Sequence, residues 1–221
     1  MPASEKKNSL HNPSYRREEE KIKKACDVMI NAFYIAAPPL KAEIISIRLA
    51  RLMNKIIRSD NVNTPGKRNI NEGNIWLLEG FQFNQDYPMP PVDREYEAAI
   101  DRMDSVAICC QNNFVAASAM TLLPDTTHVQ FFLLVAAINF DKNAYSFSFG
   151  CSGDLQVDKE YHLELSNKIP NRSNSAIIMG LGLFQLRPVN KYGKNMYQLC
   201  EPSCQIIKAS DSRIYINRDY T

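Results

Sequence analysis

The sequence predicts an α+β protein in which an N-terminal helical hairpin, or arm, precedes a mainly antiparallel β domain of the sandwich or jelly-roll kind. Three observations support this. Apolar residues recur at helical spacing within residues 13–59, a polar and turn-rich linker covers residues 60–73, and short runs rich in β-branched and aromatic residues fill residues 74–221. Residues 1–12 are polar and aperiodic, so we expect a disordered basic tail there.

Composition is consistent with a packed core and gives no sign of export. The 221 residues are 45% hydrophobic and 23% charged, which is ordinary for a globular protein. The N-terminal residues contain no apolar stretch, so we expect no signal peptide. The longest apolar run, residues 129–140, is too short for a transmembrane helix, which needs ~20 residues. We therefore expect an intracellular protein, either soluble or peripheral to a membrane.

The first predicted helix begins near Asn12, because asparagine caps helices well and Pro13 suits the first turn. Its apolar residues fall on a single stripe, which indicates one buried side: Ile22, Cys26, Met29, Phe33 and Ala36. Pro38 and Pro39 end the helix, since proline removes a backbone donor and clashes with the preceding turn.

The second predicted helix, within residues 41–60, separates apolar from cationic side chains. At about 100° per residue, one side of the helix collects Ala42, Ile45, Leu49, Leu52, Met53 and Ile56. Another side collects Lys41, Arg48, Arg51, Lys55 and Arg58. Only Glu43 and Asp60 lie near, so few intrahelical ion pairs can neutralise these cations. The short proline-containing turn between the two helices predicts a helical hairpin.

The structure of the remaining segments is predicted from their local sequence patterns. Because residues 60–73 are polar and turn-forming, we expect this linker to bury nothing. Residues 145–149 alternate aromatic and serine side chains, which is typical of a strand with one dry face. Residues 96–103 are predicted to form one short helix. Gly180 and Gly182 lie on one face of a predicted strand, where a missing side chain allows an aromatic ring or another strand to approach closely.

Charge is strongly segregated along the chain. Residues 1–70 contain 14 Lys and Arg against 7 Asp and Glu, whereas residues 71–221 contain 12 against 17. A concentrated cationic segment favours an acidic partner, such as nucleic acid, an anionic membrane surface or an acidic protein face. The alternative is a solvated helix face without a partner.

We predict that the basic face binds a polyanion, either RNA or an anionic membrane surface. Arginine forks and lysine point charges both suit phosphate groups. The predicted contacts are Arg48, Arg51, Lys55 and Arg58, with weaker attraction from Lys41 and from Arg16, Arg17, Lys21, Lys23 and Lys24. The apolar side of the second helix carries no Trp or Phe, which argues against insertion into a membrane.

No catalytic, metal or cofactor motif is complete in this sequence, and we expect no metal and no cofactor. Cys200 and Cys204 have a spacing that zinc can use, but no second pair is present, so buried thiols are the preferred interpretation. His162 lies on an alternating strand, which indicates a surface or cross-strand position. The alternative is a hydrolase with a Cys or acidic site in the β domain. Such a site requires His128 or His162 beside a thiol or carboxylate in a pocket.

Two further segments predict protein contacts. The densest acidic run can receive the basic helix of a second copy, and so predicts self-association: Asp93, Glu95, Glu97, Asp101 and Asp104. The proline-rich segment Tyr87–Tyr96 has the composition of a docking peptide, which makes a protein-binding adaptor another alternative. A stiff connector is the commoner explanation for such a segment.

Together these features favour a non-enzymatic structural or assembly protein. It would self-associate and contact RNA or an anionic membrane surface through its basic helical arm. The order of basic tail, helical arm and strand-rich domain is similar to that of virion coat and matrix proteins, a resemblance of architecture that implies an assembly role.

Overall fold

The computed structural model describes residues 13–36, 42–86, 88–89, 96–171, 174–191, 194–200 and 202–211. Helix α1 spans Pro13–Ala32 and helix α2 spans Ala42–Arg58, where the sequence predicts them. The predicted tail, Pro38 and Pro39 lie outside the described residues. None of the described helices combines the length and the apolar character that crossing a bilayer requires.

Two antiparallel sheets follow the helices. The large sheet has the order β4-β3-β7-β8, with β5 beside β3 and β9 beside β7, and the small sheet has the order β1-β2-β6. The large sheet is made of β3 (His128–Asn139), β4 (Ala144–Cys151), β5 (Leu155–Gln156), β7 (Ala176–Lys191), β8 (Lys194–Leu199) and β9 (Ser203–Ser210). The small sheet is made of β1 (Tyr96–Asp101), β2 (Val106–Val115) and β6 (Glu160–Lys168). Two short helices complete the fold, η3 (Ile75–Leu78) and α3 (Ala116–Ala119). The α+β class and the sandwich-like pair of sheets are as predicted.

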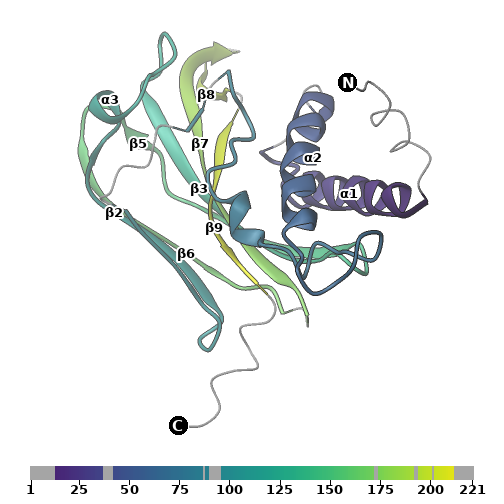
Figure 1. The fold of residues 1–221 in the computed structure, drawn as a ribbon. Coiled ribbons are helices and arrows are strands. Elements are labelled where there is room, and N and C mark those ends of the chain that lie inside the picture. Colours follow the sequence, from purple (N-terminus) through teal and green to yellow (C-terminus); the bar gives the residue numbers. More distant parts are fainter. Residues whose placement is uncertain are drawn as a thin grey trace.

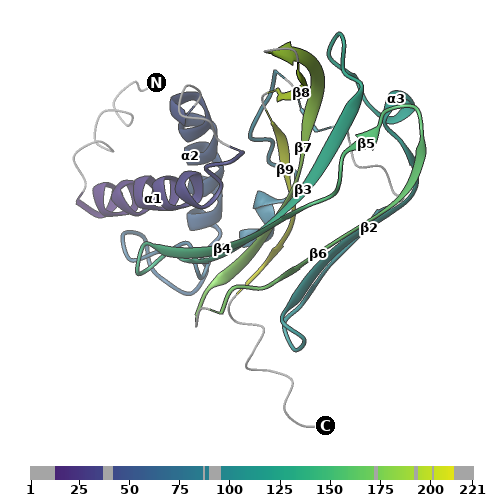
Figure 2. The same cartoon turned by 180° about the vertical axis from the view of Figure 1, so that it is seen from behind.

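The large sheet is the middle layer of the molecule. Figure 1 shows α1 and α2 on one side of it and the small sheet on the other, and Figure 2 shows the same order from behind. Strand β3 is buried on both faces: Phe132 and Leu134 belong to the core under the helices, whereas Phe131 and Leu133 belong to the core between the sheets. This explains its continuous apolar run, since a strand covered on both faces does not alternate.

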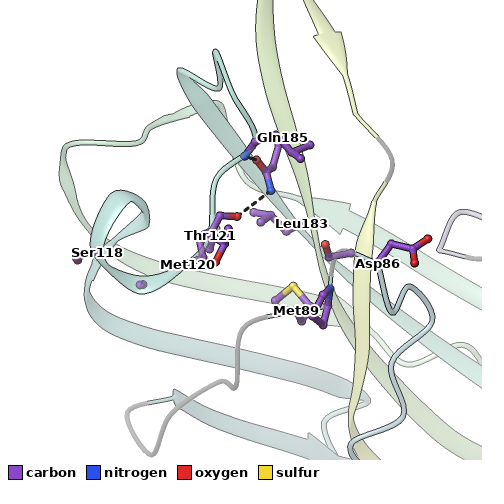
Figure 3. A pocket seen from close by; sticks show the side chains of 11 residues that line it. Asp86, Met89, Ser118, Met120, Thr121, Leu183 and Gln185 are labelled. Carbon is purple, nitrogen blue, oxygen red and sulfur yellow. Dashed lines mark hydrogen bonds between the residues drawn. The ribbon is translucent and has the colours of Figure 1, made fainter.

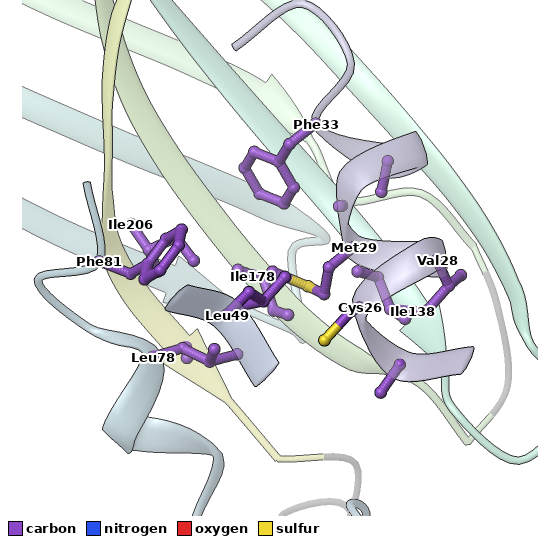
Figure 4. Packing of buried hydrophobic residues seen from close by; sticks show 14 of the residues in the cluster. Cys26, Val28, Met29, Phe33, Leu49, Leu78, Phe81, Ile138, Ile178 and Ile206 are labelled. Carbon is purple, nitrogen blue, oxygen red and sulfur yellow. The ribbon is translucent and has the colours of Figure 1, made fainter. Parts of the chain in front are cut away.

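The helical hairpin packs directly on the large sheet and does not extend away from it. Met29 of α1, Phe33 in the turn after it and Leu49 of α2 are fully buried, and Figure 4 shows them directed toward the sheet residues Ile178 and Ile206. A Cβ added at Gly180 would lie 2.7 Å from Cε1 of Phe33, and one added at Gly182 would overlap the Phe132 ring. The prediction that these glycines admit aromatic rings is confirmed.

A cavity of about 650 Å³ opens beside α3, against one end of β7 and β9 (Figure 3). The Gln185 side chain closes one wall of it. Its Oε1 accepts hydrogen bonds from the Leu123 amide at 2.7 Å and from the Thr126 hydroxyl at 3.0 Å. Met89 forms another part of the wall and is held by Gln82, which accepts a hydrogen bond from the Met89 amide at 3.0 Å.

The predicted helix over residues 96–103 is wrong. Tyr96–Asp101 is strand β1, paired antiparallel with β2 from Tyr96 opposite Gln111 to Asp101 opposite Val106. Ala98 and Ile100 pack against the core between the sheets, while Glu97 and Asp101 are exposed. The segment therefore has a period of two, and pairing with β2 overrides its helical propensity.

The expectation that residues 60–73 bury nothing is also wrong. The Asp60 side chain is 1% exposed and Ile70 is 3% exposed. Asp60 accepts hydrogen bonds from the backbone amides of Val62, Asn63 and Asn69 at 2.9–3.0 Å, and from the Asn63 side chain. Burial by itself raises the pKa of Asp60, but these hydrogen bonds outweigh it and the net pKa is lowered.

Helix α1 holds the same segment from the other side. Buried Glu18 accepts a hydrogen bond from the Gly66 amide at 2.5 Å. Gly73 lies so close to the carbonyl of Ile56 that any added Cβ would overlap it. Residues 60–73 are therefore attached to the helical layer through buried Asp60, Gly66 and Ile70, while residues such as Val62 and Lys67 remain exposed.

Candidate functional site

The apolar side of α2 belongs to the core, and this decides which way its cations face. Ile45 is 2% exposed, and Leu49, Met53 and Ile56 are 0% exposed. Arg51, Lys55 and Arg58 lie on the opposite, exposed side. None of these three side chains makes a hydrogen bond or an ion pair with any residue that the structure describes. We call them the α2 cation row.

Helical geometry gives the dimensions of this row. At a rise of about 1.5 Å per residue, Lys55 follows Arg51 by roughly 6 Å and Arg58 follows Lys55 by roughly 4.5 Å. Part of their role is local, since Lys55 and Arg58 lie in the last turn, where cations interact favourably with the helix dipole. Ile44 and Ile47 lie earlier on the same side of α2 and are 62% and 52% exposed.

Arg48, a predicted polyanion contact, is used inside the fold. Its Nη2 donates to the carbonyl of Gln82 at 2.5 Å, and its Cζ lies 4.9 Å from the centre of the Phe81 ring. Burial lowers the pKa of the Arg48 guanidinium, which nevertheless remains charged because arginine is so weakly acidic. Arg48 therefore attaches α2 to the chain that runs beside β9, and its role as a polyanion contact stays a prediction.

Lys21 also contacts backbone carbonyls, and its role as a polyanion contact likewise stays a prediction. Its Nζ donates to the carbonyls of Lys67 at 3.2 Å and Arg68 at 2.5 Å, so it helps to anchor the segment after α2. The other predicted α1 cations are exposed: Arg16, Arg17, Lys23 and Lys24. Lys41 lies outside the described residues. Arg48 and Lys21 therefore both donate to backbone carbonyl oxygens.

The predicted acidic run is not a helix face. Asp93 and Glu95 lie outside the described residues, and Asp101 accepts hydrogen bonds from the amides of Met103 and Asp104, which shape the turn after β1. Glu97 pairs in register with Cys110, and Cys110 pairs with Glu164. Burial and then these two carboxylates raise the pKa of the Cys110 thiol.

An acidic surface does exist, on the outer face of the small sheet. Exposed Glu97 of β1 lies on it with Glu164 and Glu160, which share one face of β6 because they are separated by even numbers of residues. Helices α1 and α2 lie beyond the other face of the large sheet (Figure 1). The α2 cation row and these three glutamates therefore occupy opposite sides of the molecule.

The hydrolase alternative finds no assembled site among the described residues. His162 is exposed, with Nδ1 2.5 Å from Oδ1 of Asn112 on β2, which confirms the predicted cross-strand position. His128 contacts the hydroxyl of Thr127 at 2.9 Å and the ring of Tyr197. Neither histidine lines the cavity of Figure 3, whose described wall has Asp86 as its carboxylate and contains no cysteine.

The cysteines are free thiols, and no group of three or more possible metal ligands occurs within the described ranges. Cys204 is fully buried beside Gly180, and Cys200 is partly buried. Burial raises the pKa of Cys26 and of Cys109 to about 12, and burial also raises the pKa of Cys204. Protonated, buried thiols behave as small apolar groups.

Sequence reasoning passed over Trp76. It is the one tryptophan of the chain, and its side chain is 56% exposed on η3, between buried Ile75 and Leu78. The signal was present, because a tryptophan follows a turn-rich segment directly after the cationic helix. Its exposure depends on how η3 packs, which the local sequence does not specify.

Comparisons with known protein families, with curated proteins and with solved structures found nothing that matches this chain. The fold and the geometry of its surfaces therefore carry the functional argument alone.

Proposed function

We propose that this chain is a non-enzymatic structural or assembly protein that binds RNA through the α2 cation row. The observation that carries the proposal is the exposure of Arg51, Lys55 and Arg58 on one side of a helix whose other side is core. Cations that have no partner among the described residues can neutralise phosphates at little cost in folding energy, and they gain from the release of counterions.

RNA is favoured over a membrane because α2 cannot insert. An amphipathic helix binds a bilayer by burying its apolar face in the lipid, but Leu49, Met53 and Ile56 already lie in the protein core. Only Ile44 and Ile47 offer apolar surface along the row. The row is roughly 10 Å long and presents three cations, so it can contact about three phosphates of one strand.

Self-association is the second part of the proposal, and the opposite positions of the two charged surfaces support it. The outer face of the small sheet carries Glu97, Glu160 and Glu164, while the cation row lies on the far side. Copies with oppositely charged faces attract one another head to tail. Because RNA and the acidic face would use the same cations, RNA competes with this contact.

The test is RNA binding as a function of salt. Anisotropy of a labelled single-stranded RNA is measured from about 50 to 300 mM KCl for the wild type and for the variant Arg51→Gln, Lys55→Gln, Arg58→Gln. Each phosphate contact contributes about 0.7 to the slope of log affinity against log salt, so the slope should fall by about 2. The matched control removes three exposed cations outside the helical layer, by Lys142→Gln, Lys159→Gln and Lys208→Gln.

The proposal fails if the α2 variant binds RNA as well as the wild type, or if the control variant loses as much affinity as the α2 variant. In the latter case only net charge matters. Sedimentation with vesicles containing anionic lipid forms the second arm. Binding to vesicles without binding to RNA would replace RNA by a membrane surface as the partner.

A further inference from the structure

Trp76 is held in an exposed position by the residues around it. Ile75 and Leu78 are 4% and 0% exposed and anchor η3 in the core under the helices. The Asn74 side chain caps η3 by accepting a hydrogen bond from the Trp76 amide at 3.2 Å. Tryptophan gains more from burial than most residues, so an anchored element that directs its ring outward calls for a partner.

Hydrogen bonds connect the end of α2, which carries the cation row, to the start of η3, which carries Trp76. The Ser59 hydroxyl donates to the carbonyl of Ile56 at 2.6 Å and accepts from the Asn74 amide at 2.7 Å, which joins the end of α2 to the start of η3. Ser59 lies one turn after Lys55 on the same side of the helix, since its amide donates to the Lys55 carbonyl. Ser59 and Trp76 line one hollow of about 190 Å³.

The acidic residues around the hollow restrict which part of a strand can approach it. Glu72 and Asp211 line the hollow together with Trp76. Carboxylates repel phosphate groups. A strand whose phosphates follow Arg51, Lys55 and Arg58 would therefore turn a base, and not its backbone, toward the hollow.

We propose that Trp76 is a stacking platform for one unpaired base of a single-stranded RNA whose phosphates lie along the α2 cation row. The proposal rests on the proposed function and deepens it, because it names single strands as the substrate class. Stacking on an aromatic side chain tolerates any base and requires that the base be unpaired.

Intrinsic fluorescence tests this directly, because Trp76 is the only tryptophan in the chain. Titration with a 12-nucleotide oligoadenylate should quench the emission at saturation. A 12-nucleotide abasic strand should bind through its phosphates and leave the emission unchanged, and a 12-base-pair RNA duplex should also fail to quench.

Variants provide the second readout, the affinity for labelled oligoadenylate measured by anisotropy. Trp76→Ala should weaken binding by roughly 5- to 100-fold, and Trp76→Phe should recover part of the loss. Tyr34→Ala is the matched control, because Tyr34 is an aromatic residue of similar exposure, 57%, outside the hollow. Circular dichroism verifies that each variant is folded.

The two proposals fail in distinguishable ways. RNA binding that depends on the cation row, without quenching and with unchanged affinity in Trp76→Ala, overturns the stacking platform and leaves the proposed function intact. Equal quenching by the abasic strand also overturns it. Absence of RNA binding at about 50 mM salt overturns both.

Discussion

The helical layer and the small sheet cover opposite faces of the same large sheet, and they attach to it differently. The helices insert a ring, Phe33, over a bare backbone position at Gly180. The small sheet contributes alternating apolar side chains such as Leu165, and hydrogen bonds hold its edges. Arg102 donates to the carbonyls of Ser210 and Asp211, and the Asn167 side chain donates to the carbonyl of Leu133 at 2.6 Å.

The outer surfaces of the two layers differ as well, and packing does not explain that difference. Arg51, Lys55 and Arg58 on the helical layer are exposed, as are Glu97 and Glu164 on the small sheet. Exposed charges contribute little to stability. The inner faces are therefore determined by folding, whereas the segregation of charge on the outer faces is available for partners.

The largest effect on stability is expected at Gly180, where Phe33 packs against a backbone position that has no side chain. Gly180→Val places a side chain against Phe33 and against the sulfur of Cys204, which lies 3.3 Å from an added Cβ. Overpacking of this kind should lower the free energy of unfolding by about 3 kcal/mol, measured by urea denaturation. Gly153→Val is the control, since nothing lies within 4 Å of a Cβ there. Equal stability of the two variants would show that ring insertion does not hold the layer.

A smaller effect is expected at the buried carboxylate behind α2. Asp60→Ala leaves the amides of Val62, Asn63 and Asn69 without their acceptor and should cost about 2–3 kcal/mol at pH 7. The control is Asp158→Ala, which removes an exposed carboxylate.

The same site predicts a pH dependence. The pKa of Asp60 is lowered in the folded state, so its contribution is fully present above the unfolded value of about 3.9 and is lost as pH falls through the folded value. The stability difference between the wild type and Asp60→Ala should therefore be constant above about pH 5 and shrink in more acidic solution. A difference that persists undiminished to pH 2 would contradict this assignment.

The smallest effect on stability, and the sharpest on association, is expected from the outer charges. The variant Glu97→Gln, Glu160→Gln, Glu164→Gln and the α2 variant with three glutamines should each unfold within about 0.5 kcal/mol of the wild type. At low salt, light scattering should detect assemblies of the wild type but only monomers of either variant. Mixing the two variants restores one cationic and one acidic face, so pairs should form without further growth. Assemblies that persist in either variant alone would rule out the head-to-tail contact.

Local sequence patterns correctly predicted the elements whose side chains recur with one clear period. The stripe containing Cys26, Met29 and Phe33 is buried as its spacing indicates, and Gly180 and Gly182 admit rings as expected. The prediction failed at Tyr96–Asp101, where an alternating pattern of small and charged residues also fits a helix. It failed again at Asp60 and Ile70, because burial of a polar segment depends on hydrogen-bond partners that come from elsewhere in the chain.

The candidate site was also predictable from the sequence only in part. Composition identified a cationic first third, and helical spacing identified the side of α2 on which its cations gather. It could not separate Arg48 from Arg51, since both lie on the polar side and only the chain beside β9 brings the Gln82 carbonyl to Arg48. The sequence could not reveal the internal contacts of Lys21 for the same reason, because its carbonyl partners come from a segment more than forty residues away.

The sequence by itself determined the helices, the strand-rich second part and the sign of the charge on α2, because periodicity and composition are local properties. The tertiary structure alone decided which cations remain exposed, that Glu97, Glu160 and Glu164 lie on the far side of the molecule, and that Trp76 is exposed on η3 next to the end of α2. These outcomes depend on which residues, distant in the sequence, are brought together by packing. The periodicity of a short segment does not contain that information.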